Sequence, residues 1–172
     1  MFKRGEMDVV RPLIQPETKK ELLKIKGVTL VAEPGVNQQF FWLNNTRAPL
    51  DDVNCRRALA YAVDYEVIHS LEEIRPGLTG AKPSHGPLLE TMAGFDPELP
   101  PFAKRDLPKA KAYLAKCKYK PADHRIDIAW ISTNLKSKKF ALILQSNWKE
   151  LGFESDTQSL VWAHYVTRLA KA

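Results

Sequence analysis

The residues best able to bind a metal ion or attack a substrate are few in this sequence. It contains two cysteines, Cys55 and Cys117, and four histidines, which are His69, His85, His124 and His164. Zinc sites use such residues at short, repeated spacings, but no Cys-x-x-Cys pair occurs and the histidines lie far apart. The sequence therefore predicts no metal site. It predicts two buried free thiols, and a Cys55–Cys117 disulfide stays open as the alternative.

Motifs of covalent or nucleotide chemistry are also missing from the sequence. There is no nucleophile elbow, no P-loop, no HExxH and no GxGxxG that opens a helix after a strand. Carboxylates are plentiful, but Asp51 and Asp52 lie at the start of a helix, where acids cap exposed N–H groups. We therefore expect a protein that binds and is not an enzyme, with no catalytic residue and no cofactor.

The charge pattern also excludes one class of partner. The net charge is +6, from 26 basic and 20 acidic residues. Lysines are scattered at helix-surface spacing, and no aromatic residues interleave with them as an RNA-stacking surface requires. This favours a solvated basic face and predicts no nucleic-acid partner. Arg56 and Arg57 are interpreted as helix-surface residues that pair with a nearby acid such as Asp52.

Helices and strands are predicted to alternate along the chain. The clearest helix spans 51–64, where one face carries Cys55, Ala58, Leu59, Ala62 and Val63. Other helices are predicted over 17–26, 65–73 and 136–151 and from residues 106 and 162 onward. Strands are predicted over 28–33, 38–44, 126–132 and 153–160. This order predicts an α/β domain with a mixed sheet.

Residues 75–105 differ from the rest of the chain. They hold six of the 12 prolines and four glycines. Apolar residues such as Leu88 and Phe95 punctuate them, which favours an ordered loop over a flexible linker, and long loops inside compact domains are usually functional. We divide the chain into an entry segment, a strand-and-helix segment, this Pro-rich loop and a helix–strand–helix–strand–helix segment, over 1–37, 38–74, 75–105 and 106–172.

Residues 40–68, FFWLNNTRAPLDDVNCRRALAYAVDYEVI, resemble the signature segment of the family 5 extracellular solute-binding proteins. In that family a strand ends in Asn-Asn or Asn-Thr and leads through Pro and Asp into a Val-Arg-x-Ala-Leu-x-x-Ala-x-Asp helix. The matching residues here are Asn44, Asn45, Pro49, Leu50, Asp51, Asp52, Val53, Arg56, Arg57, Ala58, Leu59, Ala62 and Asp64.

Later motifs of the family follow in the same order. They correspond to Gly86-Pro87, Gly94-Phe95-Asp96-Pro97, a helix with Asp106, Lys109, Ala110, Leu114 and Ala115, then Leu151-Gly152 and Trp162. The resemblance therefore covers nearly the whole chain. Lys118 departs from it, because the family commonly has Gly there, and this puts the helix end at that point in question.

The resemblance implies one lobe of a type II periplasmic-binding-protein-like fold. Family members close two lobes over a solute, so the other lobe and the signal peptide are expected outside residues 1–172. The implied function is that of the substrate-binding component of an ABC importer, which delivers peptides or similar small solutes to a membrane permease. The implied location is periplasmic or extracytoplasmic, with membrane association in Gram-positive-type cells.

The resemblance also indicates where a ligand would lie. Peptides suit main-chain hydrogen bonds and aromatic pockets. The aromatic strand and the start of the last helix resemble wall segments of the family's cleft. Because strand side chains alternate, Phe41 points opposite to Phe40 and Trp42, and one of these sets belongs to the core. The ligand-binding candidates are Phe40, Phe41, Trp42 and Trp162, with Asn134 and His85 as weaker ones in polar loops.

A second class of protein fits the same resemblance. Some bacterial transcriptional regulators carry a family-5-like region behind a DNA-binding domain, and the chain would then sense a ligand in the cytoplasm. A signal peptide upstream would indicate the importer component, and a winged helix upstream would indicate the regulator. A hydrolase lobe is the third interpretation, and no constellation of residues supports it.

Overall fold

The computed structural model describes residues 4–9, 16–31, 37–99 and 104–170, and the structural statements below refer to these residues. None of their helices is both long and apolar enough to cross a lipid bilayer. The elements, in chain order, are α1 (Pro16–Leu23), α2 (Val53–Ala62), α3 (Tyr65–Ser70), β1 (Glu73–Arg75), β2 (Leu78–Thr79), α4 (Leu107–Leu114), the short 3-10 helix η2 (Pro121–Asp123), β3 (Arg125–Ile131), α5 (Leu135–Lys149), β4 (Glu154–Leu160) and α6 (Trp162–Ala170).

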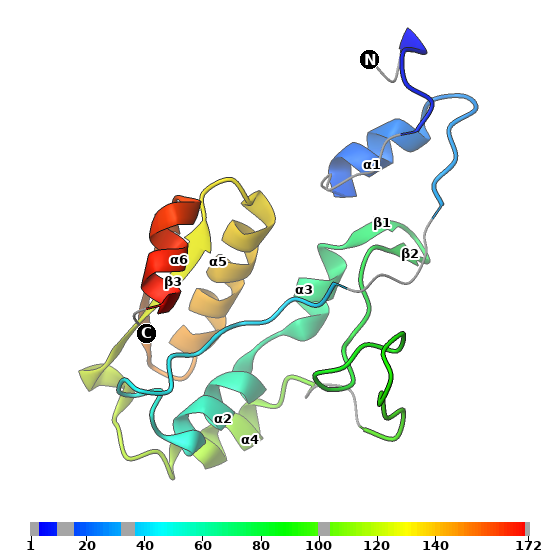
Figure 1. The fold of residues 1–172 in the computed structure, drawn as a ribbon. Coiled ribbons are helices and arrows are strands. Elements are labelled where there is room, and N and C mark those ends of the chain that lie inside the picture. Colours follow the sequence, from blue (N-terminus) through cyan, green and yellow to red (C-terminus); the bar gives the residue numbers. More distant parts are fainter. Residues whose placement is uncertain (1–3, 10–15, 32–36, 100–103, 171–172) are drawn as a thin grey trace.

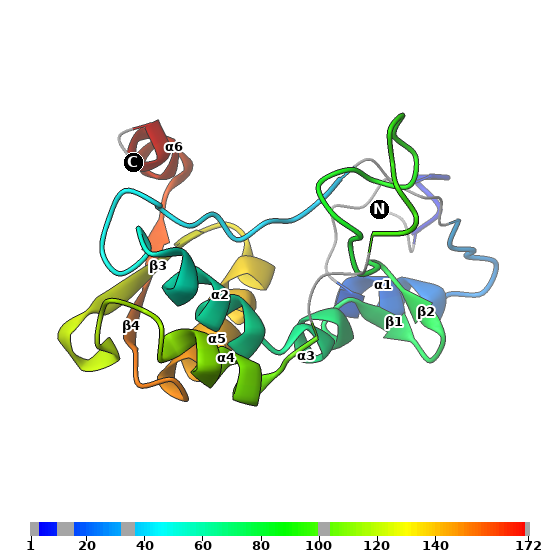
Figure 2. The same ribbon diagram turned by 90° about the horizontal axis from the view of Figure 1, so that it is seen from below.

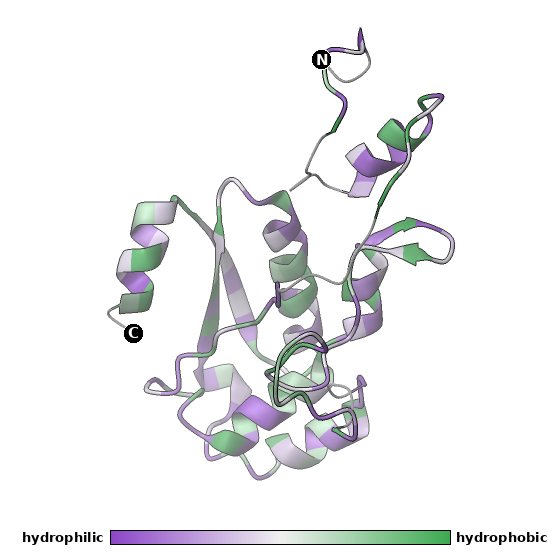
Figure 3. Cartoon of the chain, turned by 45° about the vertical axis from the view of Figure 1, so that its right-hand side comes forward, coloured by the Kyte–Doolittle hydropathy of each residue, from purple (hydrophilic) through white to green (hydrophobic). Residues whose placement is uncertain are grey.

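Helices α2, α4 and α5 and strands β3 and β4 form what we call the packed unit. The two strands are parallel, with Arg125 opposite Glu154 at one end and Ile131 opposite Leu160 at the other. Parallel strands need a crossover connection, and α5 supplies it. Helices α2 and α4 lie side by side at the C-terminal end of α5 (Figures 1 and 2). Figure 3 shows that α5 carries both hydrophobic and hydrophilic residues, as a helix with one buried face does.

The hydrophobic core lies where α2 meets α5 and the start of β4. Phe153 and Leu59 are almost wholly buried, and the indole N–H of Trp148 donates to the carbonyl oxygen of Leu59 at 3.2 Å. Burying one such large side chain stabilises the fold by roughly 1.5–3 kcal/mol. The buried cluster consists of Ala58, Leu59, Ala62, Val63, Ala110, Ile126, Leu144, Trp148, Leu151 and Phe153.

Helix α1 and the hairpin β1–β2 form a second region, which we call the arm. The two short strands pair antiparallel, and Gly77 in the turn between them has a φ of +77°, which glycine adopts without strain. The arm lies to one side of the packed unit, next to α3 (Figures 1 and 2). Two ion pairs connect it to the start of α5: the Lys136 Nζ lies 2.8 Å from Glu72, and the Lys139 Nζ lies 2.8 Å from Glu17.

Most of the predicted elements are confirmed. The helix expected over 51–64 is α2, and the helix expected over 136–151 is α5. The helix expected over 65–73 is the shorter α3, because the chain turns into β1 at Glu73. The strands expected over 126–132 and 153–160 are β3 and β4. Gly152 follows α5 with a φ of +87°, as the residue after a helix end often does. The predicted α/β class is therefore confirmed.

Two predicted strands are wrong in the part of the chain that the structure describes. Residues 28–31 and 38–44 have no strand partner; residues 32–33 lie outside the described ranges. Apolar alternation suits a strand, but a strand also needs a neighbour to pair with. The predicted Pro-rich loop begins with the β1–β2 hairpin, and its residues 100–103 lie outside the described ranges. Instead of one mixed sheet, the described residues contain separate parallel and antiparallel two-stranded sheets.

Candidate functional site

The aromatic residues 40–42 lie in an extended segment that runs past α5 without pairing to a strand (Figure 1). The Phe41 ring meets the buried Phe140 ring of α5 edge-on, with centroids 6.2 Å apart. Phe40 and Trp42 contact each other on the other side, with centroids 5.6 Å apart. They are 50% and 73% exposed. Phe41 thus contacts the core through Phe140 on one side of the segment while it stays 40% exposed, and Phe40 and Trp42 contact each other on the other side.

Trp162 opens α6 and is 64% exposed. Its ring stacks on that of Tyr165, with centroids 6.2 Å apart and an interplanar angle of 21°. No described residue of α6 is buried, and Arg168 attaches the helix to β4 by donating to Gln158 at 2.7 Å. The chain that follows the aromatic segment bends toward the end of the packed unit where α6 lies (Figures 1 and 2).

Asn134 has a structural role that the sequence interpretation missed. Its side-chain oxygen accepts a hydrogen bond from the Ser137 N–H at 3.1 Å and so caps the first turn of α5. An Asn at this position satisfies a helix N–H group that would otherwise have no partner. The amide nitrogen is the part of this side chain that remains for a ligand.

His85 belongs to the Pro-rich loop, whose described residues lie on the side of the molecule away from α6 (Figure 2). Its Nδ1 is 3.0 Å from the Leu99 carbonyl oxygen, and its ring meets Phe95 edge-on. Gln38 connects this loop to the start of the aromatic segment, because its amide donates to the Gly86 carbonyl oxygen at 2.8 Å and to Ser84. The loop that holds His85 and the helix that Trp162 begins thus lie toward opposite ends of the aromatic segment (Figure 2), and the six candidates are not gathered at one point.

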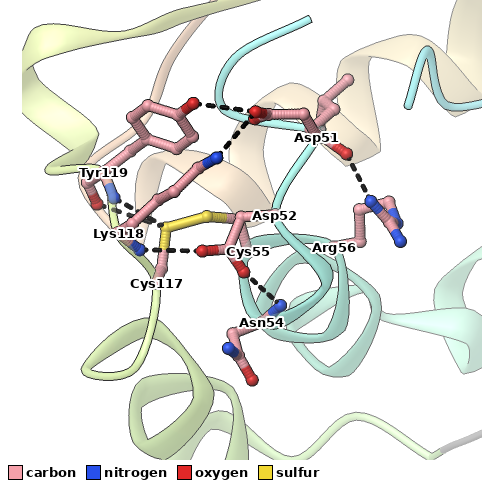
Figure 4. Close-up of polar contacts among 9 residues, drawn as sticks. Asp51, Asp52, Asn54, Cys55, Arg56, Cys117, Lys118 and Tyr119 are labelled. Atoms are coloured by element: carbon pink, nitrogen blue, oxygen red, sulfur yellow. Dashed lines mark hydrogen bonds and ion pairs between the residues drawn. A yellow bond between two sulfur atoms is a disulfide. The ribbon is translucent and has the colours of Figure 1, made fainter. Parts of the chain in front are cut away.

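A second group of polar residues, which we call the disulfide cluster, joins α2 to the chain after α4. Cys55 and Cys117 form a disulfide with a Cα–Cα distance of 5.0 Å, so the predicted free thiols are wrong and the open alternative is the one found. The spacing in sequence concealed it, because 62 residues separate the two cysteines. Each cysteine lies on the apolar side of a helix or just beyond its end, and the packing of α2 on α4 brings them together (Figure 4).

Two carboxylates surround this disulfide. Asp52 caps α2 by accepting from the Asn54 N–H at 2.7 Å, and it also accepts from the Lys118 N–H at 2.9 Å. Asp51 accepts from the Lys118 ammonium at 2.8 Å and from the Tyr119 hydroxyl at 2.9 Å (Figure 4). Lys118 therefore has a role of its own where the family commonly has Gly. The predicted capping role is confirmed for Asp52.

Hydrogen bonds from Lys118 lower the pKa of both Asp51 and Asp52. Its ammonium holds the pKa of Asp51 below its ordinary value, and its backbone N–H does the same to the pKa of Asp52.

The prediction that Arg56 or Arg57 pairs with Asp52 is wrong. Arg56 donates to the Leu50 carbonyl oxygen at 2.7 Å, and the Arg57 guanidinium lies over the Tyr113 ring. The carboxylate of Asp52 is already occupied by backbone N–H groups.

In the described ranges, one group of side chains comes within metal-binding distance of one another. One ligand atom from each of Asp52, Cys55 and Cys117 lies within 4.8 Å of the others. Thiolates bind metals, but the two sulfur atoms here are bonded to each other. The group therefore serves to join two helices.

A groove of about 320 Å³ between α5 and β4, lined by residues such as Gln145 and Ser155, contains none of the predicted ligand-binding residues.

Comparison with known proteins assigns this arrangement to a family. The family model for bacterial extracellular solute-binding proteins, family 5, matches residues 1–172. The chain belongs to this family. Heme-binding protein A of Haemophilus influenzae is 31% identical over 157 residues, which cover 86% of this chain and 27% of that protein. The dipeptide-binding protein of Escherichia coli is 28% identical over 165 residues, 92% of this chain and 29% of that protein.

Solved structures show the same fold. The ABC transporter substrate-binding protein CtaP of Listeria monocytogenes superposes with a TM-score of 0.83 at 21% identity, over 96% of this chain and 33% of that one. HbpA2 of Haemophilus parasuis gives a TM-score of 0.73 at 26% identity, over 98% and 33%. The predicted type II periplasmic-binding-protein-like fold is confirmed. The chain spans about a third of the length of these relatives.

Proposed function

We propose that this chain is one lobe of a two-lobed substrate-binding protein of an ABC importer, which binds peptides or similar small solutes. Family membership supports this. Two further relatives support it too: the oligopeptide-binding protein OppA of Bacillus subtilis is 29% identical over 176 residues, and the "probable D,D-dipeptide-binding periplasmic protein" of Escherichia coli is 29% identical over 170 residues. The chain acts as a binding module and carries out no chemistry.

The observation that carries the proposal is the set of exposed aromatic rings on the lobe. Trp42 and Trp162 are 73% and 64% exposed, and Phe40 is 50% exposed. Large aromatic rings left in solvent are unfavourable unless something covers them, and a solute between two closing lobes would do so. We assign Phe40, Trp42 and Trp162 to the wall that faces the solute. Phe41 supports that wall from the core side, and Asn134 and His85 are secondary contacts.

The disulfide supports an extracytoplasmic location for the protein. Disulfides form and persist in oxidising compartments and are rare in the cytosol, and Cys55 and Cys117 are bonded here. The same observation disfavours the ligand-sensing region of a cytoplasmic transcriptional regulator. In our proposal the protein delivers its solute to a membrane permease, and in Gram-positive-type cells it is held at the membrane.

Calorimetric titration of the full-length protein with di-, tri- and longer peptides tests the proposal. We expect at least one peptide class to bind, and we expect Trp42→Ala and Trp162→Ala each to weaken that binding about tenfold, because buried aromatic anchors dominate binding energy. Leu142→Ala is the matched control, since Leu142 is 46% exposed on the surface of α5. Unchanged affinity in both tryptophan variants would show that the ligand lies elsewhere.

A further inference from the structure

Basic residues are scattered along the chain, but their excess over acidic residues comes from one short stretch. Residues 104–120 contain seven of the 26 basic residues and one of the 20 acidic ones, so this stretch alone carries a charge of +6. The other 155 residues carry 19 basic and 19 acidic residues and are neutral in sum. The stretch consists of α4 with its two flanks. The net charge of the whole chain therefore equals that of this stretch, in which Arg105 and Lys118 pair with acids from outside it.

That surface is formed by α4 together with the adjacent side of α2, and we call it the α2–α4 face. Its exposed cations are Arg57, Lys109, Lys111 and Lys116. Within the described residues, no carboxylate lies within ion-pair distance of any of these four. Figure 2 looks toward this side of the packed unit, where α2 and α4 are the nearest helices. The four cations are thus available to an anionic partner.

Two tyrosine rings hold three of these cations in position. Tyr61 of α2 and Tyr113 of α4 stack almost parallel, with centroids 5.6 Å apart. The Lys109 ammonium lies 4.3 Å from the centre of the Tyr61 ring, and Arg57 and Lys116 lie over the Tyr113 ring at 5.6 and 6.0 Å. Such contacts restrict long side chains before any partner arrives, which reduces the entropy lost on binding. The hydrogen bond with Tyr61 also raises the pKa of Lys109, so this residue stays charged.

The composition of the face indicates the kind of partner. Six of the seven basic residues in 104–120 are lysines, and the one arginine, Arg105, is engaged by Asp64 and Glu150. Protein interfaces have apolar centres and favour arginine over lysine, but no large apolar side chain in this stretch is exposed. Flat arrays of hydrated lysines instead suit a diffuse anionic surface, as phospholipid headgroups present.

We propose that the α2–α4 face docks the protein on an anionic phospholipid surface by electrostatic attraction. This goes beyond the proposed solute binding and does not depend on it, because the face is built from residues other than the aromatic wall. Docking of this kind would orient the lobe at the membrane where a permease is embedded. Attraction of each lysine or arginine to an anionic leaflet strengthens membrane binding about fivefold.

Co-sedimentation of the full-length protein with lipid vesicles tests the proposal. We expect binding to vesicles of phosphatidylcholine mixed with phosphatidylglycerol, little binding to phosphatidylcholine alone, and loss of binding as salt is raised. The variant K109Q/K111Q/K116Q should bind about a hundredfold more weakly, since it lacks three cations of the face. K109R/K111R/K116R keeps the charge and should bind as the unaltered protein does. A peptide titration of the same samples reports the proposed solute binding separately.

The matched control is K20Q/K26Q/K149Q, which removes the same charge from exposed positions elsewhere. It should reduce vesicle binding far less than the variant of the α2–α4 face. Equal losses in the two triple variants would overturn the proposal, because net charge alone would then explain binding. Equal binding to neutral and anionic vesicles would overturn it too. So would binding to neutral vesicles that appears only when a permease is embedded in them, since the partner would then be a protein.

Discussion

A hydrophobic core holds the packed unit together, whereas ion pairs attach the arm to it. In the packed unit, α2, α4, α5 and the two parallel strands enclose a core with Phe153 and Leu59 almost wholly buried. The arm lies beside it and is connected to the start of α5 by the ion pairs Lys136–Glu72 and Lys139–Glu17. Hydrophobic burial is not screened by dissolved ions, whereas ion pairs near the surface are weak and screened. The two regions should therefore respond differently to mutation, reduction, pH and salt.

The largest effect is expected from Phe153→Ala. The Phe153 side chain is fully buried, and removing such a ring costs about 3–5 kcal/mol through lost burial and the cavity left behind. Urea denaturation of the packed unit measures this loss. Ile74→Ala is the comparison in the arm, where Ile74 is 4% exposed; it should increase amide hydrogen exchange in the arm and leave the unfolding of the packed unit unchanged. An equal shift of that transition in both variants would mean that the two regions unfold as one.

Loss of the disulfide should have the next largest effect. The cysteines are 62 residues apart in sequence, and closing a loop of that length stabilises a fold by about 4 kcal/mol in the chain-entropy account. We expect C55A/C117A to unfold at lower urea concentration. The unaltered protein should shift to the same midpoint when a reductant is added, and the variant should not respond to reductant. A variant as stable as the parent would show that the packing of α2 on α4 is sufficient without the bond.

Glu72→Gln should weaken the contact between the two regions. The Glu72 side chain is only 9% exposed and the Lys136 side chain 22%, so the variant leaves a half-buried ammonium without its counterion. The expected cost is about 1–3 kcal/mol. Hydrogen exchange in β1 and β2 should rise while the core amides of α5 stay protected. Glu73→Gln, at an exposed neighbouring position, serves as the control and should change neither.

The disulfide cluster should make the packed unit sensitive to acid. Lys118 lowers the pKa of Asp51 and Asp52 in the folded state. Their contribution to stability is therefore complete above the ordinary carboxyl pKa of 3.8 and is lost as the pH falls through the lower folded values. Asp51→Asn should give a flatter dependence of stability on pH below about 4. Acid unfolding followed by circular dichroism measures this, and identical acid profiles for the two proteins would contradict the role given to Asp51.

The smallest effect is expected at the second ion pair of the arm. Glu17 and Lys139 are 61% and 47% exposed, and exposed pairs contribute about 0.2–1 kcal/mol. A double-mutant cycle with Glu17→Gln and Lys139→Gln should give a coupling energy in that range. The coupling should disappear at high salt, because mobile ions screen exposed charges. A coupling that persists in high salt would indicate a contact more buried than the structure shows.

The local elements of the packed unit are those that the sequence predicts well. The apolar stripe of α2 from Cys55 to Val63 becomes one buried side, because helical periodicity and burial depend on residues close in sequence. The strand candidates over 28–33 and 38–44 fail where they are described, because pairing depends on a distant neighbour that periodicity cannot reveal. For the candidate site, alternation alone separated Phe41 from Phe40 and Trp42, and the resemblance to a known family identified the fold.

By itself, the sequence determined the α/β class, the helical core stripe, the family resemblance and the concentration of charge in residues 104–120. These depend on composition and on spacings of a few residues. Tertiary structure alone decided the Cys55–Cys117 bond, the pairing of Asp51 with Lys118 and Tyr119, and the stacking of Tyr61 on Tyr113. Each of these joins residues more than 50 positions apart, and only the packing of α2 against α4 and the turn after it brings such atoms within bonding distance.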